Sequence, residues 1–183
     1  MSFHTTHLVR FDPEGQLLSE QHVEIPRAQW PPERALDASF IEQLADEYVR
    51  AMQRMTLGVF YTVACGSGLA MRAPIFGDVL AFDHRQVTVG VNQVSLSWSV
   101  VGGAMQSRRA RNAGQIVFEA VEDQSGAGVT LIIRVEDYTT RLIDLFGRRP
   151  GIIVYHMTQG LSHRTLTLRF LREAAARLTI ELA

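Results

Sequence analysis

The chain has 183 residues, a formal net charge of -1 and one cysteine, and these properties exclude several classes of protein. A chain of 183 residues can bury a substantial core, so we expect a single domain over residues 1–183. Hydrophobic residues make up 46% and charged residues 20% of the chain, as in ordinary globular proteins, and the balanced charge argues against nucleic acid as a partner.

The types of residue present also limit the expected cellular location of the protein and the reactions that its side chains can support. No apolar run approaches the ~20 residues of a bilayer-spanning helix, and the first residues lack the pattern of a secretion signal, so we expect a cytoplasmic protein. A single cysteine excludes a disulfide within the chain. All 18 basic residues are arginines, which excludes a Schiff base or a general base on lysine.

The first third of the chain predicts a hairpin followed by a helix. Thr5–Phe11 and Gln16–Ile25 read as strands, and Asp12-Pro13-Glu14-Gly15 between them suits a type I turn. After a proline-rich break, apolar residues recur at steps of three and four from Leu36 to Met55. This spacing places them on one face and predicts an amphipathic helix.

The middle of the chain predicts sheet. Runs with an alternating apolar pattern are expected to form strands at 59–65, 69–73, 79–82, 87–91 and 94–100. The apolar phase changes between Val91 and Val94, so a turn or bulge is expected near Asn92-Gln93. Serines alternate with the apolar residues around Trp98, which indicates a strand with one face toward water.

The last third predicts a hairpin, a short helix and a long helix. The strands are Gly114–Asp123 and Gly128–Asp137, and Thr140–Phe146 is expected to be a short helix. Gly147–Gly151 is interpreted as a break. Leu161–Leu178 is amphipathic and predicts a long helix. Its apolar stripe is expected to contain Leu161, Leu168, Leu171, Ala175 and Leu178.

This order of elements resembles the START-like helix-grip superfamily (SRPBCC), and within it an uncharacterised family of unknown function. The stretches that carry the resemblance are Val94–Gly103, the hairpin from Gly114 to Val135, Thr140–Phe146 and Leu161–Leu178. The resemblance implies an α+β fold in which a curved antiparallel sheet wraps around a long C-terminal helix. It also implies a deep apolar cavity between the sheet and that helix.

A hot-dog fold is the alternative. The stretch Ala73–Leu80 looks like the Pro-x-x-Gly-Asp turn of hot-dog thioesterases, and this likeness implies an acyl-thioester hydrolase. Its carboxylate would come from Glu33, Asp37 or Glu42, although acidic residues at a helix start more often stabilise the helix dipole. A hot-dog does not need the helix Leu161–Leu178, so we favour the helix-grip.

Titratable residues form no recognisable motif. The six histidines are not spaced as metal ligands, so we interpret them as surface or locally satisfied residues and expect no metal and no cofactor. Cys65 is interpreted as a buried, inert thiol. The arginines at 108, 109 and 111 are expected in a solvated loop, with a protein-interaction site as a further alternative.

The predicted function is binding of a hydrophobic small molecule between the sheet and the C-terminal helix, and we favour a binding protein over an enzyme. Alternation places Arg72 and Arg134 on the opposite side of the sheet from the ligand. Whether the chain forms a homodimer is left open. The expected ligand-binding residues are Tyr61, Met71, Trp98, Phe118, Leu131, Ile133, Leu168 and Leu171.

Overall fold

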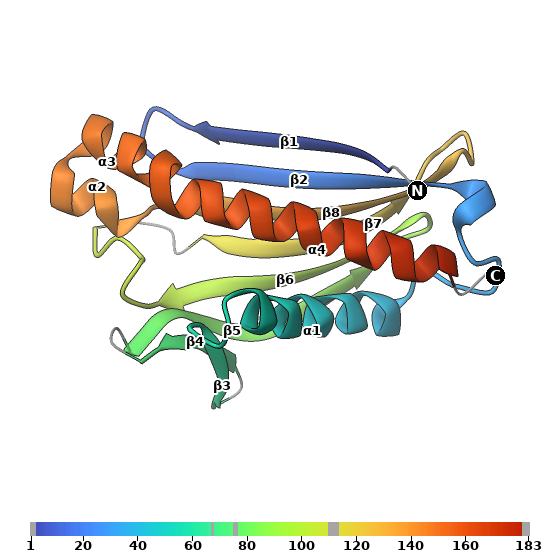
Figure 1. Cartoon of the computed structure of the whole chain (residues 1–183), viewed down its shortest axis with the longest axis horizontal. Helices are drawn as coiled ribbons and strands as arrows, with labels where there is room; N and C mark the ends of the chain where they lie inside the picture. Colours follow the sequence, from blue (N-terminus) through green and yellow to red (C-terminus); the bar gives the residue numbers. More distant parts are fainter. Residues whose placement is uncertain (1–2, 67, 75–76, 110–113, 181–183) are drawn as a thin grey trace.

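The computed structural model describes residues 3–66, 68–74, 77–109 and 114–180 (Figure 1). Its architecture is α+β: an eight-stranded antiparallel sheet with α-helices on one face. The strands are β1 (His4–Phe11), β2 (Leu17–Pro26), β3 (Tyr61–Cys65), β4 (Gly68–Ala73), β5 (Gly77–Val89), β6 (Gln93–Gly102), β7 (Gln115–Glu122) and β8 (Gly128–Tyr138). The helical segments are a short 3-10 turn (Arg27–Gln29), α1 (Ala38–Met55), α2 (Arg141–Phe146), α3 (Arg148–Tyr155), the π-helical turn η2 (His156–Gly160) and α4 (Leu161–Ile180).

The sheet order is β1-β2-β8-β7-β6-β5-β4-β3, so the first hairpin joins the last one through the pairing of β2 with β8. On β6, Val94, Leu96, Trp98 and Val100 are buried, whereas the serines between them are only half-buried. β7 and β8 repeat the alternation in register, with Leu96 opposite Phe118 and Phe118 opposite Ile133. One face of the sheet therefore carries the core, as the alternating sequence predicted.

Helices α1 and α4 lie side by side on that face (Figure 1), with α1 over β6 and β7 and α4 over β2. Asp37 caps the start of α1 by accepting a hydrogen bond from the Phe40 amide at 2.8 Å. On α4 the inward stripe contains Thr167, Phe170, Leu171 and Ala174, which are all buried. Leu161 was expected on this stripe but is 58% exposed, because it lies beside the stripe at the solvent-facing start of the helix.

Gly147–Gly151 was predicted as a break, and this interpretation is wrong. Only Gly147, at φ +81°, interrupts the helical backbone; α3 then begins at Arg148. Pro150 is tolerated because it lies in the first turn, where the amide has no partner within the helix. At Gly151 a Cβ would meet Ile143 Cα at 2.7 Å, so glycine allows α3 to pack closely against α2.

Two expectations about the edge of the sheet also need correction. The segments predicted at 79–82 and 87–91 belong to one strand, β5, which bends at register shifts near Phe82 and Arg85 instead of stopping. Cys65 is exposed, because β3 is the last strand of the sheet.

Candidate functional site: an apolar cavity at one end of the sheet

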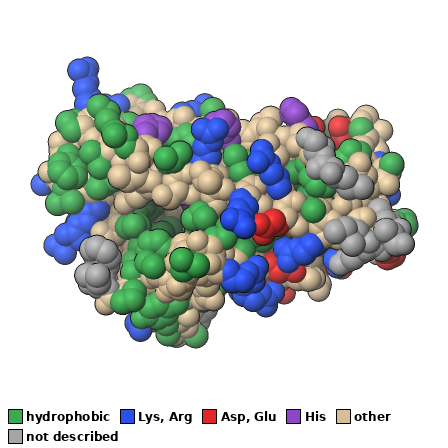
Figure 2. Space-filling view, viewed as in Figure 1, with side chains coloured by type: hydrophobic (Ala, Val, Ile, Leu, Met, Phe, Trp, Pro, Cys, Tyr) green, Lys and Arg blue, Asp and Glu red, His purple; other side chains and the backbone are tan. Residues whose placement is uncertain are grey.

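A cavity of about 320 Å³ lies between the sheet, α1 and the start of α4. It opens at the end of the molecule where α2, α3, β3 and β4 lie. Figure 2 shows a hollow with hydrophobic walls at this end. A volume of this size falls within the usual range for a small-molecule site.

The walls of the cavity are mainly apolar and come from both the sheet and the helices. Residues without a hydrogen-bonding side chain line most of it: Leu17, Met52, Phe60, Met71, Val79, Leu80, Val100, Met105, Ile116, Val135 and Leu166. Met52, Met71 and Met105 have flexible, polarisable side chains that can adapt to ligands of different shape. The sheet contributes Val79, Val100 and Val135 here, together with larger residues such as Ile116 and Tyr138.

Seven further lining residues carry a polar group: Tyr48, Tyr138, Tyr155, Thr158, Gln159, Ser162 and His163. Four of them already have partners within the protein. Tyr48 is hydrogen-bonded to Thr167 at 3.2 Å, which connects α1 to α4, and Tyr138 donates to the Met105 carbonyl at 2.6 Å. Thr158 donates to the Val154 carbonyl, and Gln159 accepts from Thr140. These bonds hold the rim of the cavity in place.

None of the described residues that line the cavity carries a charge at neutral pH. Burial raises the pKa of Tyr48 above its usual 10.0, although the hydrogen bond between Tyr48 and Thr167 opposes this. Burial, with a smaller contribution from a neighbouring tyrosine, also raises the pKa of Tyr138 and of Tyr155. The three phenols are therefore neutral, and the cavity favours an uncharged ligand over an ion.

His163 differs from the other polar groups of the lining. The residue as a whole is half-buried, but both ring nitrogens are buried, and neither has a hydrogen-bond partner among the described residues. Burial lowers the pKa of His163 from 6.5 to about 4, so its imidazole is neutral at pH 7. The expectation that the histidines are surface or satisfied residues is wrong at this position.

The sequence contained a signal for His163. It precedes Thr167 by one turn, and Thr167, Phe170 and Ala174 follow at helical spacing on the inward stripe of α4. An inward stripe that contains Thr167, Phe170 and Ala174, and not Leu161, would have predicted that the imidazole of His163 faces the sheet.

The π turn η2 positions this end of the site. The backbone stays helical from α3 through η2 into α4, because the residues at both junctions have right-handed helical angles. Thr158 and Gln159 of η2 line the cavity beside Ser162 and His163 of α4. A π turn inserts one extra residue into a helix and often occurs at functional sites.

The structure brings only one of the eight expected ligand-binding residues to the wall of the main cavity, Met71. Trp98 lines a cleft of about 20 Å³ that shares Met71 and Tyr48 with the cavity. Phe118, Leu131, Ile133 and Leu171 lie in the packed core, Leu168 is half-buried on α4, and Tyr61 is exposed on β3. The alternating pattern identified inward side chains but not the ones that border empty space.

The other candidates lie outside the cavity. Asp37 serves as a helix cap, and Glu33 and Glu42 are exposed. Asp78, from the turn that looked like a hot-dog motif, is paired with Arg72; residues 75 and 76 of that turn lie outside the described residues.

The arginines fall into two groups. Arg134 pairs with Glu20, Glu119 and Glu136 on the opposite face of the sheet from the core. Arg108 and Arg109 are exposed, and Arg111 lies outside the described residues. The side chains of Arg134, Arg108 and Arg109 do not contribute to the cavity wall.

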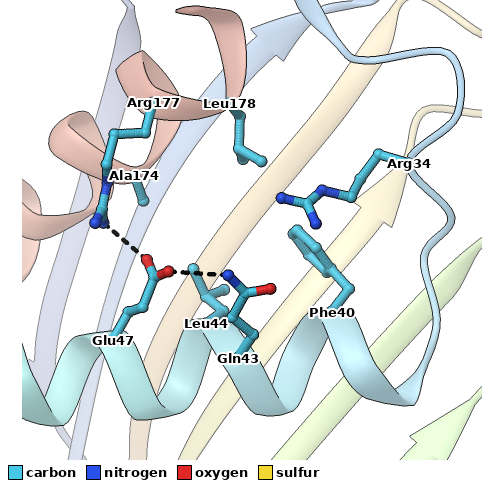
Figure 3. A pocket seen from close by; sticks show the side chains of 8 residues that line it. All are labelled: Arg34, Phe40, Gln43, Leu44, Glu47, Ala174, Arg177 and Leu178. Carbon is cyan, nitrogen blue, oxygen red and sulfur yellow. Dashed lines mark hydrogen bonds and ion pairs between the residues drawn. The ribbon is translucent and has the colours of Figure 1, made fainter. Parts of the chain in front are cut away.

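Two other depressions are less suited to an apolar ligand. At the other end of the helix pair, a pocket of about 70 Å³ lies between α1 and α4 (Figure 3). Glu47 accepts from Arg177 at 2.8 Å and from Gln43 at 3.1 Å beside it. A groove of about 360 Å³ between β1 and the start of α4 includes His7, His156 and Arg164, all exposed.

The described residues contain no group of three or more His, Cys, Asp or Glu side chains that could hold a metal ion. No helix within the described ranges is long and apolar enough to cross a membrane.

The fold and the site together define an α+β protein with an apolar, uncharged cavity under its C-terminal helix. No family model and no curated protein sequence matches the chain. The function must therefore be inferred from the cavity and its lining.

Proposed function

We propose that the chain is a helix-grip protein, similar to the START-like superfamily, and that it binds a hydrophobic small molecule in this cavity. The observation that carries the proposal is the cavity itself: about 320 Å³ with mainly apolar walls, open to solvent at one end. Solvating such walls with water is unfavourable, and an apolar ligand would release that water.

The chemistry of the lining supports binding over catalysis. Tyr48, Tyr138 and Tyr155 stay protonated, and the imidazole of His163 is a weak base because burial lowers its pKa to about 4. The described lining residues include no carboxylate and no thiol. A nucleophile paired with a general base, which covalent hydrolysis requires, is not present among them.

The proposal is tested by filling the cavity. Val100 lies on β6 with its side chain in the cavity wall and is 1% exposed, whereas the next residue, Val101, is 59% exposed. The probe is N-phenyl-1-naphthylamine, an uncharged dye whose emission rises in apolar surroundings. We expect Val100→Trp to weaken dye binding by about tenfold or more, because the indole occupies the ligand's space.

Val101→Trp is the matched control, because it adds the same side chain to the same strand outside the cavity. It should leave the dissociation constant of the dye unchanged. Circular dichroism and a thermal melt establish that both variants are folded. A folded Val100→Trp variant with the dye affinity of the wild type would contradict the proposal.

A further inference from the structure

The imidazole of His163 has no partner for either of its nitrogens among the described residues. A buried polar group without a hydrogen bond costs on the order of 1–3 kcal/mol, so native proteins rarely retain one without a reason. His163 also lies in the cavity wall, one turn from the Tyr48–Thr167 hydrogen bond that marks where the packed core begins. The unpartnered group and the empty space therefore adjoin each other.

The ring can reach the cavity without a change of backbone. Rotation about the last side-chain torsion of a histidine has a broad minimum, and a half-turn moves Nδ1 to the position of Cδ2 and Nε2 to the position of Cε1. A neutral imidazole has one N–H donor and one acceptor nitrogen, so it can serve either kind of ligand group. Tyr48, Tyr138, Thr158 and Gln159 already have partners. Of the other polar lining residues, Tyr155, Ser162 and His163, only His163 has polar side-chain atoms that are both buried and unpartnered.

We propose that His163 is the polar anchor of the cavity, and that its ligand is an uncharged, mainly apolar molecule carrying one hydroxyl or carbonyl group that hydrogen-bonds the imidazole. This inference rests on the proposed function and specifies the class of ligand. An apolar body matches the apolar walls, and a single hydrogen-bonding group matches His163, the described lining residue whose polar side-chain atoms are both buried and unpartnered.

The described lining residues carry no charge, which limits the kind of polar group that the ligand can carry. A carboxylate or ammonium group on the ligand would lose its hydration and would meet no opposite charge among the lining residues. A hydroxyl or carbonyl group loses much less hydration, and the hydrogen bond to His163 replaces it. The site should therefore distinguish ligands of equal size by the charge of their polar group.

The test compares four probes that share one ring system: naphthalene, 2-naphthol, 2-acetylnaphthalene and 2-naphthoate. Dissociation constants are measured at pH 7.5 by displacement of N-phenyl-1-naphthylamine from the wild type and from His163→Leu. We expect His163→Leu to weaken 2-naphthol or 2-acetylnaphthalene by about fivefold or more relative to naphthalene. A selective loss for 2-naphthol would indicate a hydroxyl ligand, and a selective loss for 2-acetylnaphthalene would indicate a carbonyl ligand.

Each outcome has a defined meaning. An equal change for naphthalene and both polar probes would overturn the role of His163, and 2-naphthoate binding as tightly as 2-naphthol would overturn the uncharged class. If naphthalene and the dye do not bind the wild type at all, the proposed function fails as well. His4→Leu is the matched control, because His4 is a well-exposed residue on β1 outside the cavity lining.

A second measurement needs no variant. In the wild type with ¹⁵N-labelled histidine, 2-naphthol should shift an imidazole nitrogen resonance of His163, and naphthalene should not. Identical spectra with the two probes would mean that only water serves as the partner of His163, and would overturn the inference.

Discussion

The two halves of α4 lie over the same sheet but in different surroundings. In the C-terminal half, Phe170, Leu171, Ala174 and Ala175 are buried against the sheet and α1. In the N-terminal half, His163 and Leu166 border the cavity. One helix therefore contributes to a filled core at one end and to an unfilled site at the other.

The difference comes from side-chain volume on the facing elements. Under the packed half, Tyr48 makes edge-to-face contacts with Phe118 and Phe170 at centroid distances of 5.3 Å each. Beneath the hollow half the sheet presents Val79, Val100 and Val135 beside larger residues such as Met71 and Tyr138. The helix covers both regions, and the side chains beneath its N-terminal half leave part of the space unfilled.

Among the variants considered, replacement of Phe118 in the packed half should cause the largest loss of stability. Phe118 is fully buried and contacts both Tyr48 and Trp98. We expect Phe118→Ala to lower the free energy of unfolding by about 3–5 kcal/mol, because it removes buried area and leaves a void. Urea denaturation measures the loss.

Met71→Ala is the companion variant from the hollow half. Met71 is half-buried and already borders empty space, so its truncation should cost less than half as much as Phe118→Ala. Equal losses for the two variants would mean that the two halves are packed alike.

Lowering the pH should reduce the stability of the fold through His163, which lies in the hollow half. Burial lowers the folded-state pKa of His163 from 6.5 to about 4, so the unfolded state takes up the proton first as the pH falls. The stability that comes from keeping His163 neutral is complete above about pH 6.5, and it is lost as the pH falls from there to about 4. The loss is about 3 kcal/mol for a shift of this size.

The pH effect can be isolated by urea denaturation at a series of pH values between about 7 and 4. In His163→Leu this part of the pH dependence should disappear, whereas His4→Leu should keep it. A wild type and a His163→Leu variant that lose the same stability over this range would show that His163 is not responsible.

The smallest effect is expected at the boundary between the two halves. Tyr48→Phe removes the hydroxyl that is hydrogen-bonded to Thr167 at 3.2 Å and leaves the aromatic packing in place. We expect the free energy of unfolding to fall by about 1 kcal/mol, since Thr167 can bond a carbonyl of its own helix instead. Tyr61→Phe, on the exposed edge strand, should leave the urea midpoint unchanged and serves as the control.

The alternating and helical patterns predicted most of the elements. β6, β7, β8, α1 and α4 form close to where the sequence placed them, because their periodicity records which side of each element faces the core. The failures have local causes. Gly151 was interpreted as a helix breaker, whereas it serves the close approach of α3 to α2. Cys65 was placed inside because the sequence did not show that β3 would be the edge strand.

The site was predicted less well than the fold. Of the expected ligand-binding residues, Met71 borders the main cavity, whereas Phe118 and Ile133 are enclosed by other side chains. Periodicity distinguishes inside from outside, but a filled interior and a hollow one have the same alternation. His163 was missed for a related reason: the inward stripe of α4 was placed on leucines, and a histidine was not considered part of it.

The sequence by itself determined the class of fold, the positions of the main strands and helices, and the expectation of an apolar ligand. These follow from local periodicity and composition, which the chain carries in every segment. Only the tertiary structure decided where the interior is empty and which polar group stays unpartnered there. Both depend on the volumes of side chains that come from distant segments, such as Val100, Val135 and His163, and meet only when the sheet and helices pack.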